Sequence, residues 1–340
     1  MPARIGDIAR RLGVSAASVS RALNDRPGVS EDLRQRILAA AQELDFAPNM
    51  AARGLATQRT QTVGLVLGKK ETPLDADPFY PLITHGAEAC LAQQGYHLIL
   101  TTVDGTQAAS ASALKLVREQ RVDGLILAGP DISPAFILAL RQSGLPCVLV
   151  DNSLQETPMD CVVSDDQAGA ASAVQHLLEH GHRDVLCLSG PQEWASSRER
   201  SQGYRLAMQE AGLTARARVI SAPKTTIDTG QALLSQAIDE GLRPSAIFAI
   251  NDSMAIGAMR TAQALGLRVP EDLAVIGFDD ISWAEMATPP LTTVRIFKEE
   301  MGALAARRLL DLLAGASSVP VRSVVGTQLV VRRSCGCAPR

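Results

Sequence analysis

The sequence predicts a small all-helical domain followed by a large α/β domain built on parallel sheets. Residues 1–60 show short helical patterns and no β-rich run. From residue 63 onward, short apolar runs typical of strands alternate with helical stretches of roughly 12 to 16 residues. The chain has 340 residues, of which 46% are hydrophobic and 20% charged, so it is long enough for two or three globular cores.

The first domain is expected to contain three short helices within residues 1–47. Apolar residues at helical spacing indicate the first helix, and Gly13 is suited to end it in a left-handed C-cap. Ser15 is a favourable N-cap for a second helix, and Ser30 is one for a third, whose apolar stripe ends near Phe46. Two helices joined by a tight glycine turn and followed by a third are typical of a helix-turn-helix domain.

A short connector follows at residues 48–61. Its Ala-rich part has a helical composition but is too short to be a stable helix alone, and Gly54 weakens it further. Residues 57–62 are polar and indicate a linker.

The remainder, residues 62–340, shows alternating strands and helices. The clearest strand patterns lie at 63–67, 97–100, 124–127, 147–150, 184–188, 246–250 and 273–277. Such alternation predicts parallel sheets covered by helices on both faces. Because so many residues exceed one comfortable core, we expect two α/β subdomains. Ligands bind outside the carboxyl ends of the strands in such sheets, so a site is expected in the cleft between the subdomains.

Charge and polarity also bound the function. Residues 1–60 hold nine Arg, no Lys and six acidic residues, a balance of +3, whereas the whole chain has −3, so the remainder carries −6. A basic end on an acidic body favours contact of that end with a polyanion. We find neither an apolar stretch that could span a membrane nor an apolar leader after Met1, and therefore expect a cytoplasmic protein without a membrane partner.

Enzyme and metal chemistry are not expected. The nucleophile-elbow, phosphate-loop and dinucleotide-binding glycine motifs are absent. Cys335 and Cys337 supply two ligands where a structural zinc wants four, and the remaining cysteines fit buried thiols. His176 and His180 have metal-ligand spacing on a helix but lack the adjacent Glu of a zinc protease, so surface or packing roles are favoured. We therefore expect neither catalytic residues, nor a metal, nor a cofactor.

Many short motifs, in order along the chain, resemble the lac repressor (LacI/GalR) family. In the first domain they are Asp7-Ile8-Ala9, Gly13-Val14-Ser15, Val19-Ser20-Arg21-Ala22-Leu23-Asn24, Pro27-Gly28-Val29-Ser30, Pro48-Asn49 and Ala52-Arg53-Gly54-Leu55. In the second they are Asp77-Pro78-Phe79-Tyr80, Arg121-Val122-Asp123-Gly124, Arg200-Ser201-Gln202-Gly203-Tyr204, Asn251-Asp252, Ile276-Gly277-Phe278-Asp279-Asp280 and Pro290-Leu291-Thr292-Thr293-Val294. Each motif is weak alone, whereas their ordered succession is specific.

The resemblance implies a domain plan. Residues 1–47 would be a helix-turn-helix DNA-binding headpiece, 48–61 a hinge helix with its linker, and 62–340 an effector-binding core with the type I periplasmic-binding-protein fold. The expected N-subdomain covers about 62–161 and 293–322, and the expected C-subdomain about 162–292 and 323–340. Where Arg4 and Gly6 stand, the family often has a capping Thr or Ser and a polar residue, so the first helix is expected to begin less firmly.

The family match assigns residues that contact DNA. Arg21 is suited to a bidentate pair with guanine in the major groove, and Ala16 and Ala17 to apolar contact with bases. Leu55 matches an apolar wedge that enters the minor groove from the paired hinge helices. The full expected set is Ser15, Ala16, Ala17, Ser18, Ser20, Arg21, Asn24, Asn49, Ala52 and Leu55. Taken without the family, the Ala residues are equally ordinary helix formers on a solvated face, and Leu55 a core residue of a connector.

The resemblance to the family also assigns residues that contact a small effector between the subdomains. They are Phe79, Tyr80, Asp151, Trp194, Ser196, Arg200, Asn251 and Asp279. Carboxylates, Asn and Arg suit the hydroxyls of a sugar, and aromatic rings suit its apolar face. Thr225 and Asp104 depart from the family pattern. A second interpretation is that Asp151 and Asp279 only cap the turns after their strands.

Together these observations predict a sequence-specific transcription regulator, in the first instance a repressor, that binds a palindromic operator as a homodimer. A sugar or oligosaccharide would control it allosterically; the alternative is a nucleobase or nucleoside acting as corepressor. A solute-binding protein without a regulatory role would share the core fold, but it would have no use for a helix-turn-helix.

Overall fold

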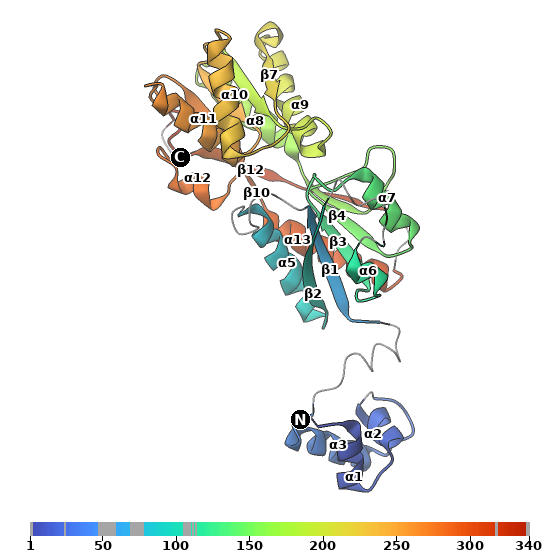
Figure 1. Cartoon of the computed structure of the whole chain (residues 1–340). Helices are drawn as coiled ribbons and strands as arrows, with labels where there is room; N and C mark the ends of the chain where they lie inside the picture. The colour runs from blue at the N-terminus through green and yellow to red at the C-terminus, as the bar shows by residue number, and fades with distance from the viewer. Residues whose placement is uncertain are drawn as a thin grey trace. The chain divides into compact units, whose positions relative to one another are not determined.

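A computed structural model describes residues 3–23, 25–46, 59–68, 78–104, 110, 112, 114–316 and 319–337. The chain separates into two units, Met1–Thr60 and Gln61–Arg340, each of which is considered by itself (Figure 1). The expected hinge helix at 48–56 lies outside the described residues, and so do Asn24, Asn49, Ala52 and Leu55.

The first unit contains the three expected helices: α1 (Ile5–Leu12), α2 (Ala16–Leu23) and α3 (Glu31–Glu43). Gly13 ends α1 with a φ of 67°, as the sequence predicts. The Ser15 Oγ accepts a hydrogen bond from the Ser18 N–H at 3.0 Å, and the Ser30 Oγ accepts one from the Leu33 N–H at 3.4 Å. These two serines therefore cap the N-termini of α2 and α3 as expected. One fully buried side chain from each helix, Ile8, Val19 and Ile37, forms the centre of the small core.

Helix α1 begins more firmly than the sequence suggests. The Arg4 backbone N–H donates to the Asp7 carboxylate at 2.9 Å. An acidic residue three positions after the N-cap thereby satisfies a backbone donor that would otherwise have only water, and its charge suits the positive end of the helix. Asp7 compensates for the missing capping hydroxyl at Arg4.

The second unit contains two sheets, each of six strands within the described residues. The first is parallel throughout, in the order β11-β5-β4-β3-β1-β2. Its strands are β1 (Thr62–Gly68), β2 (His97–Val103), β3 (Gly124–Ala128), β4 (Cys147–Val150), β5 (Cys161–Ser164) and β11 (Arg322–Val325). Its helices are α5 (Phe79–Gln93), α6 (Lys115–Arg118), α7 (Pro134–Gln142) and α13 (Lys298–Leu313).

Alternate residues of β1 explain how this sheet is covered. Leu65 packs in one cluster with Ile83 of α5 and Met301 of α13, whereas Val66 packs in another with Phe136 of α7. Successive side chains of a strand point to opposite faces, so an almost continuous apolar run is what a sheet buried on both sides requires.

The second sheet has the order β12-β10-β9-β8-β6-β7 and is parallel except for the antiparallel edge strand β12. Its strands are β6 (Val185–Ser189), β7 (Arg218–Ser221), β8 (Ala246–Ala249), β9 (Ala274–Asp279), β10 (Thr292–Ile296) and β12 (Thr327–Val330). The accompanying helices are α8 (Asp166–Glu179), α9 (Ala195–Glu210), α10 (Ile227–Asp239), α11 (Asp252–Ala264) and α12 (Ser282–Met286), with a 3₁₀ turn η3 (Thr214–Arg216).

The chain crosses between the sheets three times: after β5, after β10 and after β11. The expected subdomain boundaries at 161/162, 292/293 and 322/323 fall a few residues too early. Each expected boundary would cut a strand or assign it to the wrong subdomain. The structure keeps these strands whole, because the residues of each strand pair continuously with one sheet before the chain leaves that sheet. The corrected crossings lie at about 164–166, 296–298 and 325–327.

Candidate functional site

The first candidate site is the exposed face of α2. Ser15, Ala16, Ala17 and Arg21 are exposed, Ser18 and Ser20 are partly buried, and Val19 and Ala22 face the core. The helix therefore presents one polar or small-residue face to solvent while its apolar face holds it on the domain. Its N-terminal turn has backbone N–H groups suited to a phosphate oxygen, and the Ser15 and Ser18 hydroxyls lie 2.9 Å apart beside them.

Arg21 differs from several other arginines of this unit. Arg34 pairs with Asp25 and also donates to the Ala22 carbonyl at 3.4 Å, and Arg11 pairs with Glu43. Arg21 forms no ion pair with any described residue and is exposed on α2. An unpaired guanidinium on the exposed face of a short helix is suited to an external acceptor.

The second candidate site centres on Arg200, on α9 of the core. Its Nε donates to Asp166 Oδ1 at 2.9 Å, and its Nη1 donates to Asp279 Oδ1 at 2.9 Å and to the Ile250 carbonyl at 2.6 Å. The guanidinium also lies 4.0 Å from the centre of the Phe278 ring. None of these bonds uses Nη2. The side chain is buried, with 6% exposed.

Burial alone would lower the pKa of Arg200, but the charges of Asp166 and Asp279 outweigh burial and raise that pKa above its usual value. Asp151, at the end of β4 in the other sheet, also contributes to this rise. The structure thus brings three expected effector residues, Arg200, Asp279 and Asp151, into one electrostatic neighbourhood at the carboxyl ends of the strands.

Two of these carboxylates stand on strained backbone. Asp151 has a φ of 53° and Asp279 a φ of 107°, in the region that favours glycine. Both directly end buried strands, where strained residues often serve a ligand. The turn role anticipated as the alternative for these two residues is compatible with the same geometry.

Lys298 is a residue that sequence analysis missed. It begins α13 with only 4% of its surface exposed, and its Nζ donates to the Asp279 carbonyl and, at 3.3 Å, to the Asp280 carbonyl. Its Nζ lies 5.6 Å from the centre of the Phe79 ring, and that ring packs edge-on against Tyr80 with centroids 5.1 Å apart. Burial lowers the pKa of Lys298. Phe79, the first residue of α5, is thereby placed near the end of β9 in the second sheet.

Asp252 is fully buried beside the same strand ends. Its carboxyl accepts from the Ile281 N–H at 2.9 Å and from the Thr293 hydroxyl. Burial, and then the negative charge of Asp279, raise the pKa of Asp252 well above its usual value. The residue therefore favours its neutral form more than an exposed carboxyl does.

The remaining expected residues lie at helix starts that follow the strands. Trp194 and Ser196 are half-buried at the N-terminus of α9. Asn251 is the N-cap of α11: its Oδ1 accepts from the Met254 N–H and its Nδ2 donates to the Thr225 carbonyl, both at 2.9 Å. The Asn251 amide is therefore already used within the protein.

Ser197 is a second residue that sequence analysis missed. It is fully buried, and its Oγ has no hydrogen-bond partner among the described residues. It lies beside Gly190, where an added Cβ would come within 3.0 Å of that Oγ and 2.5 Å of the Thr225 methyl. No periodic pattern marks this serine, because its neighbours come from other elements.

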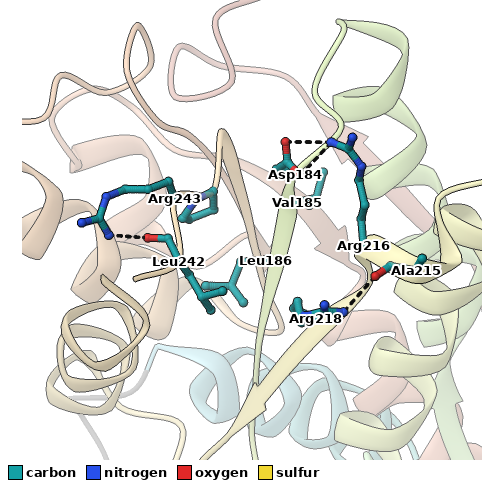
Figure 2. Close-up of a pocket in the computed structure, with 9 residues that line it drawn as sticks. Asp184, Val185, Leu186, Ala215, Arg216, Arg218, Leu242 and Arg243 are labelled. Atoms are coloured by element: carbon teal, nitrogen blue, oxygen red, sulfur yellow. Dashed lines mark hydrogen bonds and ion pairs between the residues drawn. The ribbon is translucent and has the colours of Figure 1, made fainter. Parts of the chain in front are cut away.

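A cavity of about 200 Å³ lies elsewhere, at the amino end of β6 (Figure 2). Its side chains are tied to their own surroundings: Arg216 pairs with Asp184 at 3.0 Å, Arg218 donates to the Ala215 carbonyl at 3.0 Å, and Arg243 donates to the Leu242 carbonyl at 2.8 Å. Because effectors of such sheets bind at the carboxyl ends, this cavity is not where we place the effector.

In the part of the chain that the structure describes, helices that combine the length and apolarity of a membrane span were not found.

Comparisons with known proteins match both parts of the chain. Residues 4–49 match the family described as bacterial regulatory proteins, lacI family, and residues 174–335 match the periplasmic binding protein-like domain.

Two curated relatives cover nearly the whole chain. The HTH-type transcriptional regulator CelR of Thermobifida fusca is 37% identical over 330 residues, which are 96% of each chain. The HTH-type transcriptional repressor PurR of Photobacterium profundum is 33% identical over 333 residues, which are 98% of each chain.

Solved structures show the same architecture. The complex of CelR with cellobiose is 33% identical with a TM-score of 0.71, covering 98% of this chain and 99% of that one. The lac repressor dimer bound to operator and the anti-inducer ONPF is 28% identical with a TM-score of 0.84 over the same shares.

Proposed function

The chain belongs to the lacI family of bacterial regulatory proteins, and from this premise we propose how its two sites divide the work of a repressor. The first unit reads an operator through α2, and the core binds an effector at the strand ends around Arg200. The observation that carries the proposal is that each site has its own chemistry: an unpaired exposed Arg21 in one, and a buried cation among carboxylates in the other.

In the headpiece, α2 enters the major groove with Arg21 directed at a guanine and Ala16 and Ala17 close to base edges. Ser15, Ser18 and Asn24 contact phosphates, which position the helix without reading sequence. Two copies of the chain, related by a twofold axis, then read a pseudo-palindrome, as the lac repressor dimer structure supports. Asn49, Ala52 and Leu55 complete the contact from the connector.

In the core, the effector is a sugar or oligosaccharide. Asp151 and Asp279 accept from its hydroxyls, Nη2 of Arg200 donates to them, and the rings of Phe79, Tyr80 and Trp194 cover its apolar face. The cellobiose complex of CelR supports a sugar. Similarity to PurR keeps the nucleobase alternative open, and stacking on Phe79 or Tyr80 would serve that ligand too.

The regulator works in the cytoplasm, where its operator is, and carries out no catalysis. Lys298 and the three crossings connect the two subdomains of the core. A ligand that draws the strand ends together would therefore change the geometry of both subdomains, and this change would be the allosteric signal.

Binding of the full chain to a palindromic duplex, followed by fluorescence anisotropy, tests this function. We expect affinity to fall steeply as salt rises, because phosphate contacts release counterions, and to change on addition of one member of a panel of sugars and nucleobases. Binding that is insensitive to salt and equal for scrambled duplexes would contradict the reading role. If a nucleobase raises the melting temperature and none of the sugars does, the effector is a nucleobase and not a sugar.

A further inference from the structure

Two histidines and a cysteine meet beside the second sheet, where α8 approaches the C-terminal segment. His176 and His180 lie one turn apart on α8, with ring centroids 4.4 Å apart. Cys337 comes from the C-terminal segment, and its Sγ lies 3.2 Å from His176 Nε2. One ligand atom of each residue lies within 4.8 Å of the other two. The sequence places these residues about 160 positions apart, so the expectation of surface histidines and too few cysteine ligands did not anticipate this cluster.

The C-terminal segment is held firmly where it meets α8. The Ser334 Oγ donates to the Val275 carbonyl at 2.6 Å and accepts from the Thr292 N–H at 2.8 Å. The Thr292 hydroxyl also donates to the buried Cys335 Sγ at 3.2 Å. These bonds join Ser334 and Cys335 to β9 and β10, two or three residues before Cys337.

The ring orientation of His180 is also set. Its Nδ1 lies 2.7 Å from the His176 carbonyl oxygen, one turn back along the helix. A backbone carbonyl in this position takes the Nδ1–H and leaves the lone pair on Nε2, which is the arrangement common to metal-binding histidines. His182, which is close in sequence, is instead engaged by Nδ1 with the Ser245 hydroxyl at 3.2 Å.

We propose that His176 Nε2, His180 Nε2 and the Cys337 thiolate bind a divalent transition metal ion, with Zn²⁺ as the preferred ion. Two imidazoles and one thiolate are the ligand set that suits zinc, which bonds nitrogen at about 2.1 Å and sulfur at about 2.3 Å. Tetrahedral bonds of these lengths put the nitrogen and sulfur atoms roughly 3.6 Å apart. The separation of 3.2 Å between Cys337 and His176 needs only a small adjustment.

The fourth position is taken by a water molecule, because His180 is exposed and the other two ligands are only partly buried. The thiol proton of Cys337 is released to solvent when the metal binds, so no oxidant or reductant is needed. The ion fastens α8 to the C-terminal segment, and α8 is the helix whose first residue, Asp166, holds Arg200.

Co²⁺ titration of the full chain tests the site, because Co²⁺ takes the place of Zn²⁺ and is visible. The protein is stripped of metal by chelation and kept reduced with a phosphine. We expect one equivalent of Co²⁺ to give intense tetrahedral visible bands and a thiolate-to-cobalt charge-transfer band, both removed by one equivalent of Zn²⁺. Absence of these bands at micromolar protein would overturn the proposal.

Variants identify the ligands. Cys337→Ser should abolish the charge-transfer band, and His180→Asn should weaken Co²⁺ binding by roughly a hundredfold or more, since even an outer-shell partner is worth ten- to a hundredfold. Cys90→Ser, on α5, is the matched control and should keep the charge-transfer band and the Co²⁺ affinity of the wild type. A charge-transfer band that persists in Cys337→Ser, or unchanged affinity in His180→Asn, would refute the assignment.

A stability readout separates loss of ligands from loss of fold. His180 is exposed, so the metal-free His180→Asn protein should melt at the same temperature as the metal-free wild type. Zn²⁺ should raise the melting temperature of the wild type and of Cys90→Ser but not of His180→Asn. An equal Zn²⁺ effect in all three proteins would contradict the site.

Discussion

Arg21 and Arg200 are the same residue type in opposite environments. Arg21 is exposed on α2 and makes no ion pair within the described residues, whereas Arg200 is buried between two carboxylates, a carbonyl and an aromatic ring. An exposed cation costs the fold little and remains available to a partner outside the chain. A buried one must be satisfied internally, so its removal leaves unpaired charges behind. The proposed reading site can therefore vary at little cost to stability, whereas the proposed sensing site cannot.

The largest effect is expected at Arg200. Arg200→Met should lower the free energy of unfolding of the core by about 3–5 kcal/mol, because Asp166 and Asp279 would be left buried without their cation. Urea denaturation of the full chain measures this. Arg216→Met is the matched control, since its pair with Asp184 is half-exposed and worth only about 0–1 kcal/mol. Equal losses in both variants would show that burial of the pair does not matter.

Arg21 should show the converse behaviour. Arg21→Ala should weaken operator binding by about tenfold or more, equivalent to about 1.4 kcal/mol or more, while changing the stability by less than about 0.5 kcal/mol. Gel-shift titrations with the operator and with single-base variants measure affinity and preference together. Arg10→Ala, an exposed arginine on α1, is the control and should keep the preference. An Arg21→Ala protein with unaltered preference would remove α2 from the reading role.

The carboxyl of Asp252 adds a pH dependence to the buried site. Its folded-state pKa is raised, so its contribution to stability is fully present below its unfolded pKa of about 3.9 and is lost as pH rises toward the folded value. Asp252→Asn should remove this dependence. The free energy of unfolding of the wild type minus that of the variant should therefore be largest near pH 4 and decrease toward pH 7. A difference that increases with pH would mean that the carboxylate is the stabilised form.

The headpiece cap is the smallest of these effects. Ser30→Ala should destabilise the first unit by about 1 kcal/mol, because the Leu33 N–H loses its acceptor. Hydrogen exchange of headpiece amides in the full chain measures this local stability. Gln42→Ala, an exposed change on the same helix, should leave the exchange rates of the headpiece amides unaltered. Neither variant should alter the exchange rates of amides in the second unit.

What the sequence predicted correctly rests on local signals. Gly13, Ser15 and Ser30 mark helix ends because their conformational and capping preferences act within four residues. The long apolar strands of both sheets were visible for a similar reason. The short strands β5 and β10 were placed across the subdomain boundary, because which sheet a strand joins depends on pairing with distant segments.

The sites were predictable to different degrees. The face of α2 follows from one helical period, so its exposed residues could be named from the sequence. In the core, Arg200 and Asp279 could be named by resemblance, whereas the buried positions of Lys298 and Ser197 depend on neighbours far away in the chain. The cluster of His176, His180 and Cys337 is the extreme case, since spacing alone gave no sign that the C-terminal segment returns to α8.

We propose that the chain reads a twofold-symmetric operator through α2, and selection of bound duplexes from a randomised library measures this role. We expect enrichment of a pseudo-palindrome with two half-sites, and loss of preference at one base pair in each half-site when Arg21 is replaced by Ala. Recovery of no common sequence, or of the same sequence with equal preference by the Arg21→Ala protein, would contradict the claim.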